Sequence, residues 1–390
     1  MDYYDYIKEY INNKSKFITD NILIDNNKNR EYIINTIIDG IKNEISELSE
    51  SKYRDDILYM VNNNVETLIN EFITQINSIQ RRKDQVIKLQ GLDLPKQRSE
   101  EWYQQRKQRL TASSLATALK SDKYKSRYEL INDKIQDYTP YIKNDILEHG
   151  IKYEEIATQF YEHINNVNIL EFGLIPHPEF TMFGASPDGI CDNNSHDKYI
   201  GRMLEIKCPP KRKFTKSVPE HYWMQIQGQL QCCNLDECDF LQVKISEYNS
   251  EEEYNMDKYC IDNTLQFGYT STEYPKGCII VYTDGDDNKY LYPGLFKSNE
   301  ELNQWIKEKK EWIDENNYTF KTINWWKIER YECTLVYRDD MWWSKNIGNI
   351  IQFWKDVDYY KEHRDELSSK IPAKKEIVYI NNLNTDKCLL

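Results

Sequence analysis

Two short segments constrain the fold of this chain more than any other part of it. Residues 184–189 read Gly-Ala-Ser-Pro-Asp-Gly, and residues 204–207 read Leu-Glu-Ile-Lys. The first pattern predicts a tight turn that presents Asp188, because Pro and Gly favour turns. The second predicts a short strand on which Glu205 and Lys207 share one face, while the residue between them faces the core. Two carboxylates and an amine are therefore expected to meet at one sheet edge.

These residue types suit phosphodiester chemistry at a metal centre. Two carboxylates can hold a hard divalent cation such as Mg²⁺ through oxygen. A lysine beside them can orient or help deprotonate an attacking water and offset charge on a phosphate. An ordinary solvated ion pair on an edge strand is the alternative interpretation of Glu205 and Lys207 taken alone, and the turn at Asp188 argues against it.

The composition indicates a protein without a membrane span or a disulfide framework. The chain has 390 residues, enough for two or three domains. Its mean hydropathy is −0.80, and no apolar run approaches the roughly 20 residues of a membrane helix. The N-terminus lacks a signal pattern, and nine scattered cysteines favour a reducing compartment. We expect an intracellular protein, in the host cytoplasm or a viral factory if it is viral, and not a secreted one.

The net charge of −13 is unevenly distributed. Residues 96–129 carry nine Lys or Arg against four acids, and residues 201–216 carry six against one. Both stretches flank the proposed centre, which indicates a basic cleft on an acidic body and allows a nucleic-acid partner. Solvated helix faces are the alternative interpretation of these lysines.

The hydrophobic pattern divides the chain into three regions. Residues 1–90 show helical periodicity, with Asn/Asp clusters at 25–29 and 62–64 as candidate breaks, although the second can lie within one long helix. Residues 91–317 form a mixed region, and residues 318–390 an aromatic-rich extension. Expected helices in these two regions span 99–120, 144–163, 218–233, 299–314 and about 350–369; expected β-segments span 169–175, 180–183, 202–207, 239–246 and a hairpin at 278–293.

Four further patterns accompany the carboxylates. In one of them, Gln225 and Gln229 lie one helical turn apart. Taken singly, the patterns have plainer interpretations, such as a polar helix face, a helix N-cap at the serines or a solvated glutamate. Their joint order favours one shared site. They are Trp102-x3-Arg106 followed by Arg109-Leu-Thr-Ala-Ser113-Ser114, Glu148-His149-Gly150-x3-Glu154, Ser186 in the Asp188 turn, and Tyr222-x2-Gln225-x3-Gln229.

In order and spacing these patterns resemble the YqaJ-like viral recombinase family, the family of phage lambda exonuclease, within the PD-(D/E)xK nuclease superfamily. The resemblance covers about residues 96–245 and, more loosely, extends to 316. It implies an α/β fold with a central mixed β-sheet flanked by helices, here with an N-terminal helical appendage and a C-terminal helical extension. Heavy use of Asn, Ile, Lys and Tyr is typical of AT-rich genomes, and with the resemblance it implies a large DNA virus as the source.

The resemblance also implies a role for individual residues. One position departs from the family pattern, because Pro178 and Glu179 stand where the phage member has a further acid, so one or two metal ions stay open. The implied metal ligands are Asp188, Glu205, Glu154 and the backbone carbonyl of Ile206. The other implied catalytic residues are Lys207 and Gln225, and the implied contacts to DNA and its 5′-phosphate are Arg106, Ser113, Ser186, Tyr222 and Arg109.

The implied activity is that of a Mg²⁺-dependent deoxyribonuclease, with Mn²⁺ as a substitute, that degrades linear duplex DNA from its ends in the 5′-to-3′ direction. The implied setting is viral recombination, repair or degradation of foreign DNA, with a single-strand annealing protein and a homo-oligomer as open possibilities. Alternatives are a structure-selective or nicking endonuclease on the same core, a non-catalytic DNA-binding adaptor and a polar scaffold protein. The tryptophans at 342–343 could stack on bases, but a buried core position or a subunit contact is the favoured interpretation.

Overall fold

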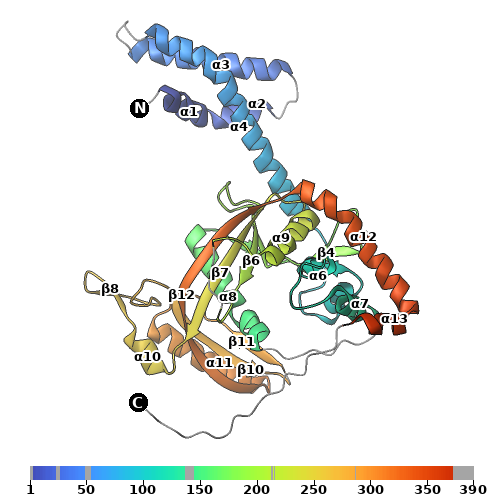
Figure 1. Cartoon of the computed structure of the whole chain (residues 1–390). Coiled ribbons are helices and arrows are strands. Elements are labelled where there is room, and N and C mark those ends of the chain that lie inside the picture. The colour runs from blue at the N-terminus through green and yellow to red at the C-terminus, as the bar shows by residue number, and fades with distance from the viewer. Residues whose placement is uncertain are drawn as a thin grey trace, which may run out of the picture. The chain divides into compact units, whose positions relative to one another are not determined.

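The computed structural model describes residues 3–22, 27–48, 54–136, 145–211, 214, 216–285 and 287–371. The chain divides into two compact units (Figure 1). The first contains Met1–Gly91 and His196–Gly201, and the second contains Leu92–Ser195 and Arg202–Leu390. The division after residue 91 lies next to the end of the expected helical region at residue 90. The expected region 318–390 belongs to the second unit and is described only as far as residue 371.

The first unit is helical, as its periodicity predicts. Isoleucine and other apolar side chains recur at three- and four-residue steps, so each helix buries one stripe against the others. Helix α4 continues through the Asn cluster at 62–64, which is therefore not a break. No helix in the described ranges combines the length and apolarity that crossing a membrane would need. The helices are α1 (Tyr3–Asn13), α2 (Ser15–Ile22), α3 (Asn27–Leu48) and α4 (Arg54–Gln90), and their core contains Ile7, Ile11, Ile18, Ile33, Ile37, Ile41, Val61, Val65, Leu68 and Ile69.

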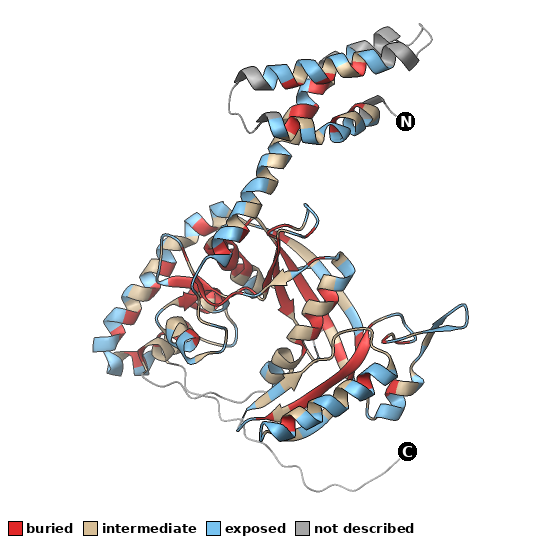
Figure 2. Ribbon diagram, turned by 180° about the vertical axis from the view of Figure 1, so that it is seen from behind, coloured by how far each residue is buried: buried red, intermediate tan, exposed pale blue. Residues whose placement is uncertain are grey.

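A seven-stranded mixed sheet organises the second unit. Its strand order is β11-β10-β12-β7-β6-β5-β2, and among the described pairs in this sheet only β6 with β7 is parallel. Figure 2 shows β6, β7 and β10 buried over most of their length, whereas β12 is largely intermediate or exposed and the helices expose one face. This arrangement confirms the expected fold class. The strands are β2 (Ile169–Leu170), β5 (Gly189–Cys191), β6 (Met203–Lys207), β7 (Glu237–Glu247), β10 (Lys276–Thr283), β11 (Asn288–Leu291) and β12 (Thr319–Tyr337).

Two helices, α8 (Asp145–Asn165) and α9 (Glu220–Cys233), cover opposite faces of this sheet. Tyr161 of α8 donates its hydroxyl to Asp239 of β7 at 2.7 Å. The next residue of β7, Phe240, contacts Tyr222 of α9 with 5.5 Å between ring centroids. Successive strand residues point to opposite faces, so the two helices lie on different sides. Glu205 pairs with Phe240 in register and therefore points toward α9.

The expected helix at 99–120 is shorter in the structure, because the chain pairs with a second sheet instead of continuing the helix. Helix α5 (Glu100–Lys107) ends before Leu110 and Thr111, which form β1 in parallel with β4 (Phe183–Ala185). Strand pairing with a distant segment overrides local helix propensity here. The small sheet has the order β1-β4-β3, where β3 is Ile175–Pro176. Strand β1 is followed along the chain by the 3-10 helix η1 (Ala112–Ser114), α6 (Leu115–Ala118) and α7 (Arg127–Ile135).

The region after residue 318 begins with a strand of the central sheet. Strand β12 spans 19 residues, pairing first with β10 and then with β7. It is followed by α12 (Asp340–Glu362) and α13 (Arg364–Lys370), so the single helix expected near 350–369 begins earlier, at Asp340, and is interrupted at His363. Trp343 is buried against Phe183, with 5.2 Å between ring centroids, in line with the core interpretation. The remaining described elements are α10 (Glu251–Met256), the hairpin β8 (Tyr259–Ile261) and β9 (Thr264–Gln266), and α11 (Asn299–Glu315).

A glycine in the middle of α9 brings this helix close to the small sheet. A Cβ atom added to Gly228 would lie 2.8 Å from Phe183 Cζ and 3.2 Å from Ala112 Cβ. Both neighbours are buried, so neither can move aside without disturbing the core. Helix α9 therefore sits at a depth that only glycine permits, and this depth sets where its polar side chains reach the sheet.

We predict that Gly228→Ala destabilises the second unit by about 1–3 kcal/mol, the usual range for overpacking a core. The matched control is Gly348→Ala in α12, where a Cβ meets nothing within 4 Å. That change should stabilise the protein by about 0.5–1 kcal/mol through helix propensity. Chemical denaturation of both variants measures the difference, and a stabilised Gly228→Ala would contradict this packing.

Candidate active site

The Asp188 turn is attached directly to strand β6. Gly189 begins β5 and pairs with Leu204, and a Cβ atom at Gly189 would lie 2.1 Å from Ile169 Cγ2. The preceding Asp188 carboxylate accepts the backbone N–H of Ile206 at 2.6 Å through Oδ2. The turn predicted from Ser-Pro-Asp-Gly thus delivers Asp188 to the strand that carries Glu205.

Glu205 is 0% exposed, and its carboxylate is held on both oxygens. Oε1 accepts from the Lys207 ammonium and from Gln225 Nε2, the latter at 2.7 Å. Oε2 accepts from Gln229 Nε2 at 2.6 Å. A buried carboxylate is tolerated when it is paired and hydrogen-bonded, and these three partners occupy both oxygens of Glu205. The face shared by Glu205 and Lys207 agrees with the sequence prediction.

Glu154 reaches the same cluster from α8, on the other side of the sheet. Its neighbour Tyr153 accepts from Cys208 Sγ through its backbone carbonyl at 3.7 Å, which joins α8 to the end of β6. Glu154 itself forms an ion pair with Arg98, with 3.0 Å between Oε2 and Nη2. Arg98 has a left-handed backbone with φ of 67°, a conformation that is uncommon outside glycine.

The three carboxylates perturb one another electrostatically. Burial raises the pKa of Asp188 well above its usual value, and the charge of Glu205 raises it further. Burial likewise raises the pKa of Glu154, against the opposing charges of Arg98 and Lys207. Burial alone would lower the pKa of Lys207, but Glu205 and Asp188 outweigh it and raise that pKa. The lysine therefore stays cationic beside these three acids.

This donor set fits a hard divalent cation by its chemistry. It supplies carboxylate oxygens, and the raised pKa values of Asp188 and Glu154 show that ionising these acids is unfavourable, a cost that a cation would relieve. In the described part of the chain, however, no three His, Cys, Asp or Glu side chains are close enough together to hold a metal ion. A bound cation would therefore require the carboxylates to move closer together, and Lys207 or Gln225 to release Oε1 of Glu205.

The expected phosphate contacts meet around Trp102. Arg106 lies over the Trp102 ring, 4.3 Å from its centroid, and donates through Nη2 to Ser113 Oγ at 3.3 Å. The indole N–H of Trp102 donates to Ser186 Oγ at 3.1 Å. Burial lowers the pKa of Arg106, and within the described residues no carboxylate forms a salt bridge with it. A partly desolvated guanidinium beside two hydroxyls can bind an anion.

The remaining expected residues differ in their position. Tyr222 lies beside the cluster, with Lys207 Nζ 5.0 Å from the centroid of its ring. Arg109 points elsewhere, because its Nη1 donates to the backbone carbonyl of Gln105 at 3.5 Å. Glu179 is exposed on the turn after β3, where its backbone N–H donates to His177 Nδ1 at 3.2 Å. The additional acid whose charge acts on Glu154 is Glu171.

Four residues of this site were not assigned a role from the sequence. The spacing of Gln229 relates it to Gln225, and the same helical turn is the signal that could predict its bond to Glu205. Trp102 belongs to the first motif, but the pattern alone indicates no function for it. Arg98 and Lys134 gave no signal, since Arg98 lies in a loop and Lys134 on a helix that was not predicted. Lys134 Nζ donates to the carbonyls of Arg106 and Arg109 at 2.6 and 2.8 Å and so holds the end of α5.

Residues 101–236 match the family model of the YqaJ-like viral recombinase domain. This segment is similar to the YqaJ-like viral recombinase domain. This confirms the resemblance read from the motifs. The matched segment contains the predicted ligands, the lysine, both glutamines and the Arg106 pocket, whereas Arg98 lies just before it.

Two relatives of this chain come from large DNA viruses, as the resemblance implied. An uncharacterised protein of Acanthamoeba polyphaga mimivirus is 35% identical over 303 residues, which cover 70% of this chain and 55% of that protein. A protein of African swine fever virus is 28% identical over 162 residues, covering 35% of this chain and 46% of that protein. The chain spans about half the length of the curated relatives it matches.

Among solved structures, this chain is similar to an alkaline exonuclease from Laribacter hongkongensis. The TM-score is 0.40 at 20% identity, and the match covers 70% of this chain and 99% of that one. A phage-related exonuclease from Haemophilus somnus gives a TM-score of 0.34 at 13% identity, covering 66% of this chain and 96% of that one.

We predict a pH-dependent contribution of Lys134 to stability. Burial, together with the charge of Arg106, lowers the pKa of Lys134 to about 7, whereas an unfolded lysine titrates near 10.4. Between these values the unfolded chain binds the proton that the folded protein lacks, so stability rises with pH through this window. Relative to Lys134→Met, the free energy of unfolding of the unmodified protein should rise by about 2–3 kcal/mol from pH 6.5 to pH 9. Denaturant titrations of both proteins at each pH test this, and a free energy of unfolding that changes equally with pH in both would contradict it.

Proposed function

We propose that this chain is a DNA exonuclease that hydrolyses linear duplex DNA from its ends, in the 5′-to-3′ direction, with Mg²⁺ or Mn²⁺ as cofactor. The observation that carries the proposal is the fully buried Glu205, bonded to Lys207, Gln225 and Gln229 and placed beside Asp188 within a YqaJ-like domain. A polar cluster of this kind is expensive to bury, and catalysis gives a reason for it. An adaptor without catalytic activity would have no need to retain it.

The residues divide the work of hydrolysis between them. Asp188, Glu205 and Glu154, with the carbonyl of Ile206, would hold the cation, which stabilises charge on the phosphate and lowers the pKa of a bound water. Lys207 carries a positive charge at the end of β6 and can offset the charge of the phosphate. Gln225 can orient a water, because its amide is already fixed by Glu205.

The pocket at Arg106 supports a preference for DNA ends. A guanidinium presents a planar set of donors that matches a phosphate, and the hydroxyls of Ser113 and Ser186 can each donate one hydrogen bond. A terminal 5′-phosphate has more free oxygens than an internal one, so it would gain more from this pocket.

The setting that we propose is viral DNA recombination, repair or degradation of foreign DNA inside the infected cell. The cysteines within the described ranges are all free thiols, which supports a reducing compartment. A homo-oligomer and a single-strand annealing partner stay predictions of the family resemblance.

Removing a site carboxylate should abolish cleavage. We expect Asp188→Asn, Glu205→Gln and Glu154→Ala each to lower the rate on linear duplex DNA by at least about 100-fold, the effect of losing one group that stabilises charge in the transition state. The matched control is Glu155→Ala, which removes the adjacent carboxylate of α8 and should leave the rate nearly unchanged. Release of nucleotides from end-labelled DNA with and without Mg²⁺ measures each rate.

The same assay on closed circular DNA separates the proposed activity from its main rival. An exonuclease leaves the closed circle intact, whereas a nicking or structure-selective endonuclease converts it to open or linear forms. Full activity on the circle, or undiminished activity of both Asp188→Asn and Glu205→Gln, would refute the proposal.

The choice of ends should depend on Arg106. Duplex DNA with a 5′-phosphate should be degraded faster than the same duplex with a 5′-hydroxyl, and Arg106→Ala should reduce that preference by about 1–3 kcal/mol, the range for a hydrogen bond to a charged group. Arg109→Ala is the control, because the Arg109 guanidinium points to Gln105 instead. Rates on both substrates give the preference, and equal rates for the unmodified protein would exclude the phosphate pocket.

A further inference from the structure

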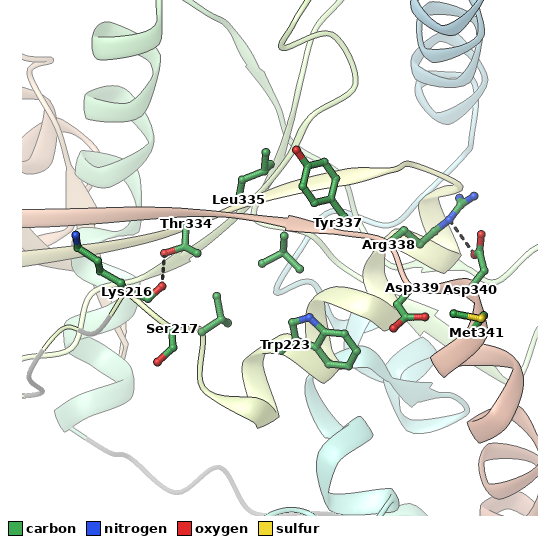
Figure 3. A pocket seen from close by; sticks show the side chains of 12 residues that line it. Lys216, Ser217, Trp223, Thr334, Leu335, Tyr337, Arg338, Asp339, Asp340 and Met341 are labelled. Carbon is green, nitrogen blue, oxygen red and sulfur yellow. Dashed lines mark hydrogen bonds and ion pairs between the residues drawn. The ribbon is translucent and has the colours of Figure 1, made fainter.

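A cavity of about 640 Å³ lies on the second unit, outside the carboxylate cluster. It is bounded by the end of β12, the loop before α9, the first turn of α9 and the first turn of α12 (Figure 3). Its volume is in the range of pockets that hold small ligands. The lining side chains used below are Lys216, Ser217, Trp223, Thr334, Val336 and Met341.

The cavity lies close to the proposed reaction centre. Glu205 pairs with Phe240, and Phe240 pairs with Thr334, so the three residues form one row across β6, β7 and β12. At about 4.8 Å between neighbouring strands, Thr334 is about 10 Å from Glu205, or about three steps along a stacked DNA strand. The ring of Tyr222, which contacts Phe240 and lies beside Lys207, stands between them.

The lining combines an aromatic and apolar wall with a cation. Trp223 is half-buried on α9, Val336 is buried, and Met341 is 74% exposed. Lys216 is exposed and ends a basic run in the sequence, Lys211-Arg-Lys-Phe-Thr-Lys216. Figure 3 shows Trp223 and Ser217 on one side of β12, with Tyr337 and Leu335 on the other.

The charged groups opposite Lys216 are largely occupied with each other. Arg338 forms ion pairs with Asp340 at 3.0 Å and with Asp236 at 3.7 Å. Asp339 accepts the backbone N–H of Trp342 at 2.8 Å and so caps α12. These acids are thus engaged in the structure, and Lys216 remains the cation at the mouth of the cavity. An aromatic platform beside a cation is how proteins bind single-stranded nucleic acid without reading its sequence.

We propose that this cavity binds an unpaired base of a DNA strand close to the cleavage site, with the base stacked on Trp223 and the adjoining phosphate beside Lys216. This inference rests on the proposed nuclease function. It adds a subsite that holds single-stranded DNA a few nucleotides from Glu205 and keeps it apart from the duplex. Stacking accepts any base, so the subsite would not restrict the sequence that is degraded.

The test measures, by fluorescence anisotropy, how tightly the full chain binds a labelled oligothymidylate of about ten nucleotides. EDTA is present so that no metal supports cleavage. We expect Trp223→Ala to weaken binding by about 5- to 150-fold, the effect of losing one stacked base. The matched control is Trp342→Ala. Trp342 is in edge-to-face contact with Trp223, 5.1 Å between ring centroids, but does not line the cavity. Both variants lose that contact, and only the first loses the platform.

Two further arms identify what occupies the cavity. An oligonucleotide with abasic positions should bind the unmodified protein as weakly as the intact oligonucleotide binds Trp223→Ala. The Trp223→Phe variant, which keeps an aromatic face, should retain most of the affinity for the intact oligonucleotide. Lys216→Gln should reduce the salt dependence of binding by about 0.7 in log–log slope, the value for one phosphate contact on a single strand.

Equal loss of affinity in Trp223→Ala and Trp342→Ala would show a structural effect and overturn the proposal, as would unchanged binding of the abasic oligonucleotide. A Trp223→Ala variant that does not fold leaves the decision to Trp223→Phe and the abasic oligonucleotide. Because binding is measured without metal, it is independent of cleavage. A chain that binds as expected but cleaves no DNA would refute the nuclease function alone, and an active nuclease indifferent to Trp223 would refute the subsite alone.

Discussion

The arrangement of the second unit depends on one buried carboxylate. Glu205 lies on a strand that is covered on both faces, where an unpaired charge would be prohibitive. Its stability there requires Lys207 from its own strand and two amides from α9. These bonds fix the distance and rotation of α9 relative to β6, and Gly228 allows the helix to approach that closely. The position of the helix, the register of the strand and the proposed chemistry are therefore consequences of satisfying this one group.

The same helix connects the reaction centre to the phosphate pocket. Gln229 donates to Glu205 and, at 3.4 Å, to the backbone carbonyl of Ser186. Ser186 in turn accepts from Trp102, and Arg106 lies over the Trp102 ring. A continuous set of contacts thus joins the guanidinium to the buried carboxylate through one serine. In the proposed enzyme, this rigidity would hold the terminal phosphate at a fixed distance from the attacking water, and such positioning is a large part of catalysis.

The accuracy of the sequence predictions follows the range of the interactions involved. Local patterns predicted the helices near 144–163, 218–233 and 299–314 and the hairpin turning at 284–285, because their signals lie within a few neighbouring residues. The predicted helix at 99–120 was too long, since Leu110 and Thr111 pair with β4, more than 70 residues later in the chain. Strand β12 was missed because its outer half is partly exposed and its partners are two distant strands, so no simple alternation of apolar residues marks it.

The sequence by itself determined which residue types could meet and on which face of a strand. Turn chemistry at Asp188, the two-residue period of a strand and the four-residue period of a helix are local and can be read from spacing. Only the tertiary structure decided that Gln229 shares Glu205 with Gln225, that Arg98 pairs with Glu154, and that Lys134 supports the end of α5. It also decided that β12 brings a cavity within about 10 Å of Glu205. These contacts join residues from separate elements, and their geometry depends on how the whole core packs.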